Sequence, residues 1–218
     1  MSYHGSAWNK WDLHVHTPAS IQHSYGGAED VWERFLLDLE KLPPEFKVIG
    51  INDYIFLDGY KRVRDEKNHG RLPNIELLLP VVELRLDKFG GSGTQLKRVN
   101  FHVIFSDELS ADVIQHQFLS ALQQSYQLSP EYDHFRANWG AVPTRDSVAE
   151  LGRLIIESVP VDKRRDFGPP LFEGFSNLCF PFSAVQSALD KPLFKDKFIT
   201  AVGRAEWAEV KWDDNTIA

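Results

Sequence analysis

The chain has 218 residues, 43% of them hydrophobic and 25% charged, a composition typical of a soluble globular protein long enough to bury one core. The net charge of −7 argues against a protein that coats nucleic acid, although it allows an enzyme to engage one locally. A single cysteine, Cys179, excludes an intrachain disulfide, and the sequence shows neither a signal peptide nor a membrane-spanning apolar run. We therefore expect a cytoplasmic protein with no membrane partner.

The first part of the chain alternates between strand-like and helix-like segments. Alternating hydrophobicity predicts a strand over Trp11–Thr17, and the segment 28–42 has the apolar spacing of a helix that ends at two prolines. A short buried strand is predicted over Lys47–Asp53. A helix is predicted over Leu57–Asn68, and Gly70 is well placed to cap its end.

The apolar run 75–86 is typical of β structure but contains Pro80. Because proline cannot donate a hydrogen bond within a sheet, the run is predicted to form a bent strand or a loop followed by a strand. The glycine-rich segment 87–95 is interpreted as a flexible turn, and a further strand is predicted over Arg98–Phe105.

The later part of the chain is predicted to be less regular. Its elements are a helix over 110–128, an irregular segment over 130–143, a helix over Arg145–Ser158, a loop rich in Pro, Phe and Gly, and strands over Phe198–Val202 and 206–212. The alternation of strands and helices favours an α/β layer or barrel over a sandwich. The abrupt stop after the last strand predicts a fragment of a longer protein.

The segment WDLHVHT, residues 11–17, is the most informative part of the sequence. On a strand, His14 and His16 project from one face about 7 Å apart, because each residue adds roughly 3.3 Å. Neutral imidazoles at this spacing can converge on one divalent ion, and Asp12 on the same face can orient them. An isolated His-x-His pattern also occurs as two polar residues at the end of a strand.

Three more polar residues lie at or near the ends of predicted strands, where a barrel would bring them together. They are Asp53, Glu83 and His102. Taken singly, Asp53 can cap a helix, Glu83 can point outward, and His102 can be a satisfied core histidine. Together with the His-x-His strand they form a set of four positions at successive strands. Such groups are costly to bury unless they are paired or bound to metal.

These segments resemble the motifs of the polymerase-and-histidinol-phosphatase (PHP) family. WDLHVHTPAS is similar to the first motif, GINDY to the second, PVVEL to the strand with the metal-bridging Glu, and NFHVIF to the strand with the next ligand His. The resemblance covers about residues 8–107 and is diffuse afterwards. It implies a PHP-like domain over residues 1–218, with the fold of a distorted (β/α)7 barrel that is incomplete at its C-terminus. It also implies phosphoester hydrolysis at two or three Zn, Mn or Fe ions.

The resemblance also implies a role for each matching residue. His14, His16 and Glu83 would hold the first metal, and Glu83 would bridge to a second metal that His102 also binds. His23 lies near the place of a third-metal ligand in some members, although this match needs a one-residue insertion. Glu83 and Asp53 are the residues expected to carry the catalysis.

The sequence departs from the family pattern at several positions. Tyr54 stands where the second motif usually has His, which puts a third metal in doubt. The Asp-x-His motif that normally completes the site is absent, since neither Asp213 nor Asp214 precedes a His. A further ligand, usually Cys or His, has no clear match, and His134 and Cys179 are both open candidates.

Basic residues are candidates for contact with a phosphate-bearing substrate. Arg62 and Arg64, with Lys61, lie just after the Asp53 loop and have the better claim. Two further clusters are Lys97 with Arg98 and the residues 163–165. Short charge runs are usually solvated surface, and this interpretation is preferred for the cluster 163–165. Arg204 and Glu206 are also candidates, although a plain internal salt bridge explains them equally well.

The sequence therefore predicts a metal-dependent phosphoesterase, with a nucleic acid or another phosphorylated molecule as its substrate. The opening residues GSAWNKWDLHVHTPAS resemble large PHP-bearing ATPases of the TrlF type, which carry an SMC- or ABC-like ATPase and are linked to bacterial antiviral defence. That likeness favours a nuclease associated with an ATPase domain or subunit. The alternative is a catalytically degenerate PHP scaffold that docks an ATPase or a partner protein.

Overall fold

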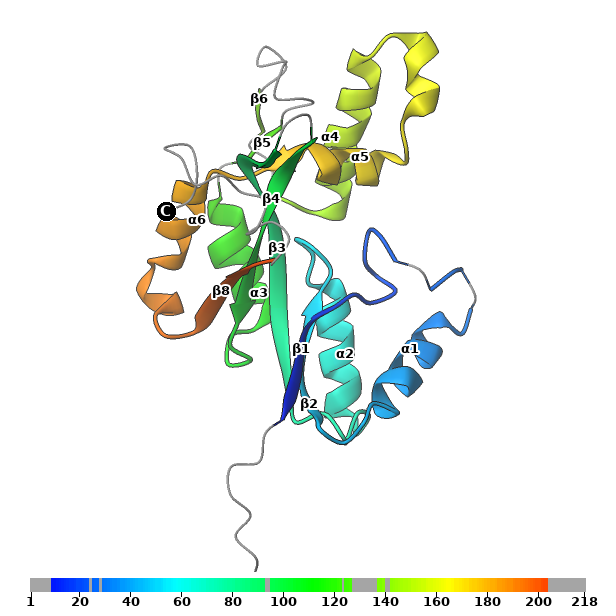
Figure 1. Cartoon of the computed structure of the whole chain (residues 1–218), viewed down its shortest axis with the longest axis vertical. Coiled ribbons are helices and arrows are strands. Elements are labelled where there is room, and N and C mark those ends of the chain that lie inside the picture. Colours follow the sequence, from blue (N-terminus) through cyan, green and yellow to red (C-terminus); the bar gives the residue numbers. More distant parts are fainter. Residues whose placement is uncertain are drawn as a thin grey trace, which may run out of the picture. The chain divides into compact units, whose positions relative to one another are not determined.

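The computed structural model describes residues 9–203 except 24, 28, 93–94, 123, 127–136 and 140–141 (Figure 1). The predicted strand over 206–212 lies outside these residues, and so do the candidates His134, Arg204, Glu206, Asp213 and Asp214. The chain divides into two compact units, residues 1–82 with 104–111 and residues 83–103 with 112–218. The assignment of residues 1–218 to one PHP-like domain stays a prediction.

The main sheet has five strands in the order β1-β2-β3-β4-β8. Strands β1 and β2 pair in parallel, as do β2 and β3. The five strands are Lys10–Val15, Phe46–Asn52, Leu77–Ser92, Gln95–Phe105 and Phe198–Val202. A second sheet, in the order β6-β5-β7, contains Gln124–Tyr126 (β5), Ala137–Trp139 (β6) and Leu178–Cys179 (β7).

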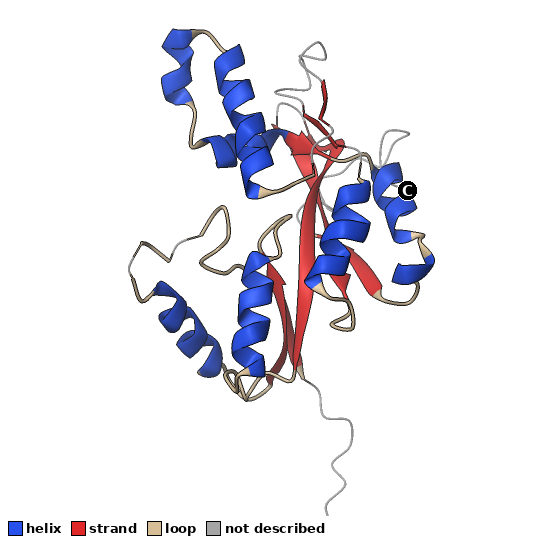
Figure 2. Cartoon of the chain, turned by 180° about the vertical axis from the view of Figure 1, so that it is seen from behind, coloured by secondary structure: helices blue, strands red, loops and turns tan. Residues whose placement is uncertain are grey.

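Helices alternate with these strands along much of the chain (Figure 2). The α-helices are Val31–Glu40 (α1), Asp58–Asn68 (α2), Ala111–Val113 (α3), Arg145–Ser158 (α4), Pro170–Asn177 (α5) and Phe182–Leu189 (α6). The described residues also contain a π-helical turn, Ile114–Phe118 (η1), and the 3-10 turns Leu119–Ala121 (η2), Val161–Asp166 (η4) and Pro192–Phe194 (η5). The predicted α/β class is thus confirmed, whereas a seven-stranded barrel stays a prediction.

The structure corrects five local predictions, one of which is the irregular segment over 130–143, since it contains strand β6. Pro80 lies within β3, paired with Ile51 of β2, so the alternative of a loop before the strand is wrong. Proline fits a strand because its fixed φ is close to the extended range, and only one ladder bond is lost. The expected turn over 87–95 is wrong for most of its length, because β3 continues to Ser92 and β4 begins at Gln95.

The other two corrections concern helices. The helix predicted over 110–128 ends at Ala121, after the π-helical and 3-10 turns, and β5 begins three residues later. The segment predicted as a Pro-, Phe- and Gly-rich loop contains α5 and α6. Pro170 is the first residue of α5, and Pro181 directly precedes α6 at its N-cap position. Proline is favoured there because its missing N–H would have no partner within the helix.

Strand β1 carries an irregularity between Asp12 and Val15, next to the first histidine of WDLHVHT. Asp12 pairs with Ile49 and Val15 with Ile51, so β1 has one residue more than β2 between these pairs. Such a bulge redirects the side chains around it. It also brings the backbone of Leu13 over Gly50 of β2, where a Cβ would lie 2.8 Å from the Leu13 Cα and 2.9 Å from its carbonyl oxygen.

Replacing Gly50 with alanine is expected to destabilise the protein by about 1–3 kcal/mol, because the added methyl must displace backbone rather than a flexible side chain. Urea unfolding of Gly50→Ala against the parent chain measures the change. Gly27→Ala is the matched control, since a Cβ there meets nothing within 4 Å. An equal free energy of unfolding for both variants would show that the bulge does not need glycine opposite it.

Candidate metal centre

His14 and His16 lie side by side at the end of β1. Their ring centroids are 5.0 Å apart and the ring planes meet at 80°. This agrees with the expectation that both imidazoles project to one side of the strand. Oδ1 of Asp12 accepts a hydrogen bond from the backbone N–H of His14 at 3.2 Å. Asp12 therefore braces the main chain of the His-x-His segment.

Glu83 completes a group of three potential ligands with these histidines. One atom from each of the three side chains lies within 4.8 Å of one from each of the others. Two ligands bound at about 2.1 Å to one ion are separated by at most about 4.2 Å, so small side-chain rotations bring this group to bonding geometry. Two imidazoles and a carboxylate suit Zn, Mn or Fe better than Mg or Ca. The group can hold a metal ion.

His102 contacts the same carboxylate. Its Nε2 is 3.3 Å from Oε2 of Glu83, and the two side chains are 12% and 5% exposed. Burial of a carboxylate is costly unless positive charge or hydrogen-bond donors compensate it. Glu83 is therefore neither an outward-facing strand residue nor buried in apolar surroundings. Glu83 of PVVEL and His102 of NFHVIF are therefore in contact, as the motifs predicted.

Three neighbouring side chains hold the histidines in place. The hydroxyl of Ser20 is 3.2 Å from Nδ1 of His16, and the Tyr25 hydroxyl donates to the His16 carbonyl at 2.8 Å. Burial, and then the negative charge of Asp53, raise the pKa of Tyr25, which keeps the phenol protonated as a donor. On the His14 side, the amide nitrogen of buried Asn52 lies 3.2 Å from Nδ1.

Asp53 ties the end of β1 to the end of β2. Its Oδ1 accepts the Thr17 backbone N–H at 2.8 Å, and its Oδ2 accepts the Thr17 hydroxyl at 2.6 Å. Both residues are completely buried. Gly59 packs against the pair so closely that a Cβ there would lie 1.8 Å from Oδ2. The contacts give Asp53 a bracing role, and its assignment as a catalytic residue stays a prediction.

Tyr54, the residue that departs from the family motif, contacts the same histidine. Its ring lies 4.9 Å from the His16 ring, and its hydroxyl donates to Oε1 of Gln22 at 3.2 Å. Its φ of +61° is in the left-handed region that a bulky residue rarely adopts, and its backbone N–H donates to Oδ1 of Asn52. Such strain costs of the order of 1–3 kcal/mol and often occurs at functional sites.

The remaining predicted site residues have other partners. His23 is exposed and accepts the Tyr25 N–H at 3.3 Å, so its role as a third-metal ligand stays a prediction. Arg62 stacks on Trp32, 4.1 Å from the ring centroid, and Arg64 donates to the Tyr60 hydroxyl at 3.1 Å. Their binding of substrate is likewise untested. Cys179, an open ligand candidate, is buried at 1% exposure.

Sequence reasoning missed the residues that support the site. Ser20 contacts the His16 ring, Asn52 contacts the His14 ring, and Thr17 binds Asp53; all three are buried. Thr17 and Ser20 lie within WDLHVHTPAS, and Asn52 precedes Asp53 in GINDY. The sequence did show them as small polar residues close to the candidate ligands. Only the fold shows which partner each one contacts.

No family model, curated protein or solved structure matches this chain. The resemblance to the PHP family therefore stays a prediction from short sequence motifs. Among the helices that the structure describes, none is long and apolar enough to cross a membrane.

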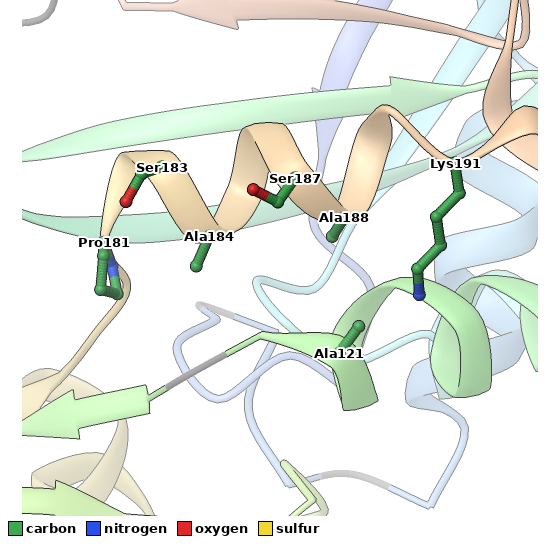
Figure 3. A pocket seen from close by; sticks show the side chains of 7 residues that line it. All are labelled: Ala121, Pro181, Ser183, Ala184, Ser187, Ala188 and Lys191. Carbon is green, nitrogen blue, oxygen red and sulfur yellow. The ribbon is translucent and has the colours of Figure 1, made fainter.

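A pocket of about 450 Å³ lies elsewhere, beside α6 (Figure 3). Small side chains line most of it, among them Ser183, Ser187 and Ala121. Its charged group, Lys191, donates from Nζ to the Gln117 carbonyl at 2.5 Å. None of the predicted metal ligands or basic substrate contacts lines this pocket, so it provides no alternative location for the site.

The double substitution His14→Ala with His16→Ala is expected to abolish binding of transition metal, because it removes both imidazoles of the group. Elemental mass spectrometry on protein purified without chelator measures Zn, Mn and Fe, with at least stoichiometric metal expected for the parent chain. His116→Ala, at an exposed position in η1, is the control and should keep its metal. Parent protein without any of the three metals would contradict the assignment.

Replacing Thr17 with valine is expected to destabilise the protein by about 1.5–3 kcal/mol, because the buried Asp53 carboxylate loses a hydroxyl donor while the shape of the side chain is kept. Thr200→Val, at an exposed position in β8, controls for the general effect of the exchange. Thermal and urea unfolding report the difference. If both variants unfold alike, the Thr17–Asp53 pair does not hold the two strands together.

Proposed function

We propose that this protein is a metal-dependent phosphoesterase of the PHP type. The observation that carries the proposal is the convergence of His14, His16 and Glu83, with ligand atoms within 4.8 Å of one another. His102 supports it by its 3.3 Å contact with Glu83. Random polar residues at strand ends rarely gather two imidazoles around a carboxylate that is almost completely buried. The distorted (β/α)7 barrel belongs to this proposal as well.

Each ligand has a defined part in the proposed site. His14, His16 and Glu83 would hold one ion, and Glu83 and His102 would hold a further one. Such ions lower the pKa of a bound water towards neutrality and neutralise charge that develops on a phosphate. Ser20 and Tyr54 fix the orientation of the His16 ring, and Asn52 fixes that of His14. Zn, Mn and Fe all suit this donor set.

We further propose that the substrate is a nucleic-acid phosphodiester, and that the chain works with an ATPase domain or subunit in antiviral defence. The support is the likeness of residues 5–20 to the opening of PHP-bearing ATPases. A net charge of −7 makes any contact with nucleic acid local rather than general. A cytoplasmic location fits such a partner and the single buried cysteine.

Tyr54 favours a second candidate function, that of a PHP scaffold without catalysis. The family motif usually places a ligand His at this position, whereas the tyrosine packs its ring on His16 and donates its hydroxyl to Gln22. A scaffold of this kind would keep the fold, bind metal weakly or not at all, and dock an ATPase or another protein. Metal content and hydrolytic activity separate the two functions.

Glu83→Gln is expected to abolish Mn-dependent hydrolysis, because a neutral amide cannot bridge two cations as a carboxylate does. The assay compares parent and variant on bis(p-nitrophenyl) phosphate and on p-nitrophenyl phosphate. We expect a loss of at least about a hundredfold in kcat/KM, equivalent to roughly 2.7 kcal/mol of transition-state stabilisation.

Glu157→Gln, an exposed position in α4, controls for the change of charge and should keep full activity. Equal hydrolysis by the parent chain and by Glu83→Gln would remove Glu83 from the active site. No hydrolysis by either protein, with metal still bound, would instead favour the scaffold function.

A further inference from the structure

Strands β3 and β4 present one polar face that begins at the Glu83–His102 pair. On β4, Val99, Phe101 and Val103 are buried, whereas the alternate residues between them are polar and partly exposed. On β3, Leu84 and Leu86 are buried, and the alternate residues are again polar. The polar face therefore contains Glu83, Arg85 and Asp87 of β3 and Arg98, Asn100 and His102 of β4.

The two strands are neighbours in the sheet and only residues 93–94 separate them, so they run antiparallel (Figure 1). Strands β3 and β4 thus form a two-stranded ribbon. Because Glu83 lies beside His102, the alternation places Arg85 level with Asn100, and Arg98 lies two residues farther along β4 from Asn100. A rise of about 3.3 Å per residue puts the Cα of Arg85 about 7 Å from that of Glu83, and the Cα of Arg98 about 13 Å from that of His102. Two cationic side chains thus follow the proposed metal ligands in a line.

Both guanidinium groups are held by the end of α5. Nη1 of Arg85 donates to the Ser176 carbonyl and Nη1 of Arg98 to the Asn177 carbonyl, each at 3.2 Å. The Arg85 guanidinium also lies 4.6 Å from the ring centroid of Phe175. These contacts limit the motion of two long side chains that would otherwise lose conformational entropy on binding a ligand. A guanidinium has five N–H donors, so it can hold a helix carbonyl and a phosphate oxygen at once.

We propose that Arg85 and Arg98 bind successive phosphates of a single-stranded nucleic acid whose scissile phosphate lies at the Glu83–His102 end of the ribbon. The proposal rests on the proposed function and names the substrate class of that site. A phosphomonoester has one phosphate and cannot reach both cations and the metal ligands. A span of about 13 Å covers up to about four stacked nucleotides at roughly 3.4 Å each.

Several features of the ribbon fit a single strand. An arginine forms bidentate, charge-assisted hydrogen bonds with phosphate, which gives the backbone a defined path. Asn100, level with Arg85, adds an amide that can donate to the same chain of phosphates or to a base. Asp87 lies on the same face, level with Arg98, and its carboxylate repels phosphate, so Arg85 is expected to make the stronger of the two phosphate contacts.

The test is fluorescence anisotropy with a labelled single-stranded oligonucleotide, on protein as purified, at several NaCl concentrations. Arg85→Gln with Arg98→Gln is expected to weaken binding about tenfold or more. The slope of log Kd against log[NaCl] should fall by about 1.4, because each lost phosphate contact removes roughly 0.7. Gel electrophoresis of the oligonucleotide after each titration shows whether it is still intact.

Lys163→Gln with Arg165→Gln removes the same charge from an exposed position in η4 and should change Kd by less than about twofold. Arg85→Lys with Arg98→Lys keeps the charges and should retain most of the salt slope, which a merely helix-holding role would not predict. A folded Gln variant that binds like the parent chain would overturn the proposal. So would a parent chain that does not bind the oligonucleotide but hydrolyses a small diester.

The proposed function fails in a different way. In that case no hydrolysis of any phosphoester is found, while arginine-dependent binding of the oligonucleotide persists. The ribbon would then stand as a nucleic-acid-binding surface on a protein without catalysis.

Discussion

The Asp53 carboxylate is completely buried, and the candidate site depends on how its charge is satisfied. Removing a carboxylate from water costs several kcal/mol unless donors replace the lost hydration. Thr17 supplies two donors, its N–H at 2.8 Å and its hydroxyl at 2.6 Å. Because Thr17 directly follows His16, the same bonds determine where the His-x-His segment ends relative to β2. Gly59 lets the helix that follows approach this pair without a side chain in the way.

A second buried carboxylate, Glu83, lies among imidazoles. His102 contacts it at 3.3 Å, and His14 and His16 bring their ring nitrogens to within 4.8 Å of it. A stable core would be built more simply from apolar residues, since buried ionic groups seldom add to stability. A divalent cation offsets the charge of such a carboxylate directly, which gives this arrangement a chemical purpose. The proposed function rests on this grouping of imidazoles around Glu83.

The ligand group could be predicted from sequence because strand alternation determines which side chains share a face. His14 with His16, and Glu83 within PVVEL, required only that periodicity and the family motifs. The Thr17–Asp53 pair could not be predicted, because it joins residues 36 positions apart and depends on how β1 and β2 align. Tyr54 was recognised as a departure from the motif, but its contact with His16 appears only in the fold.

The fold could be predicted best where one local signal dominates. Helix α4 begins after Thr144, whose hydroxyl caps it at Ser147, and its bounds agree with the apolar spacing. Pro80 in β3 misled the prediction, because pairing with β2 outweighs the single lost hydrogen bond. Helices α5 and α6 were missed because a segment rich in Pro, Phe and Gly was interpreted as a loop, although proline is also common in the first turn of a helix.

Anomalous X-ray diffraction from crystals of the metal-loaded protein tests the central claim most directly. The account predicts a Zn, Mn or Fe peak about 2.0–2.2 Å from a ring nitrogen of His14, a ring nitrogen of His16 and an oxygen of Glu83. A peak held by other residues, or an empty site in crystals of metal-saturated protein, would contradict it.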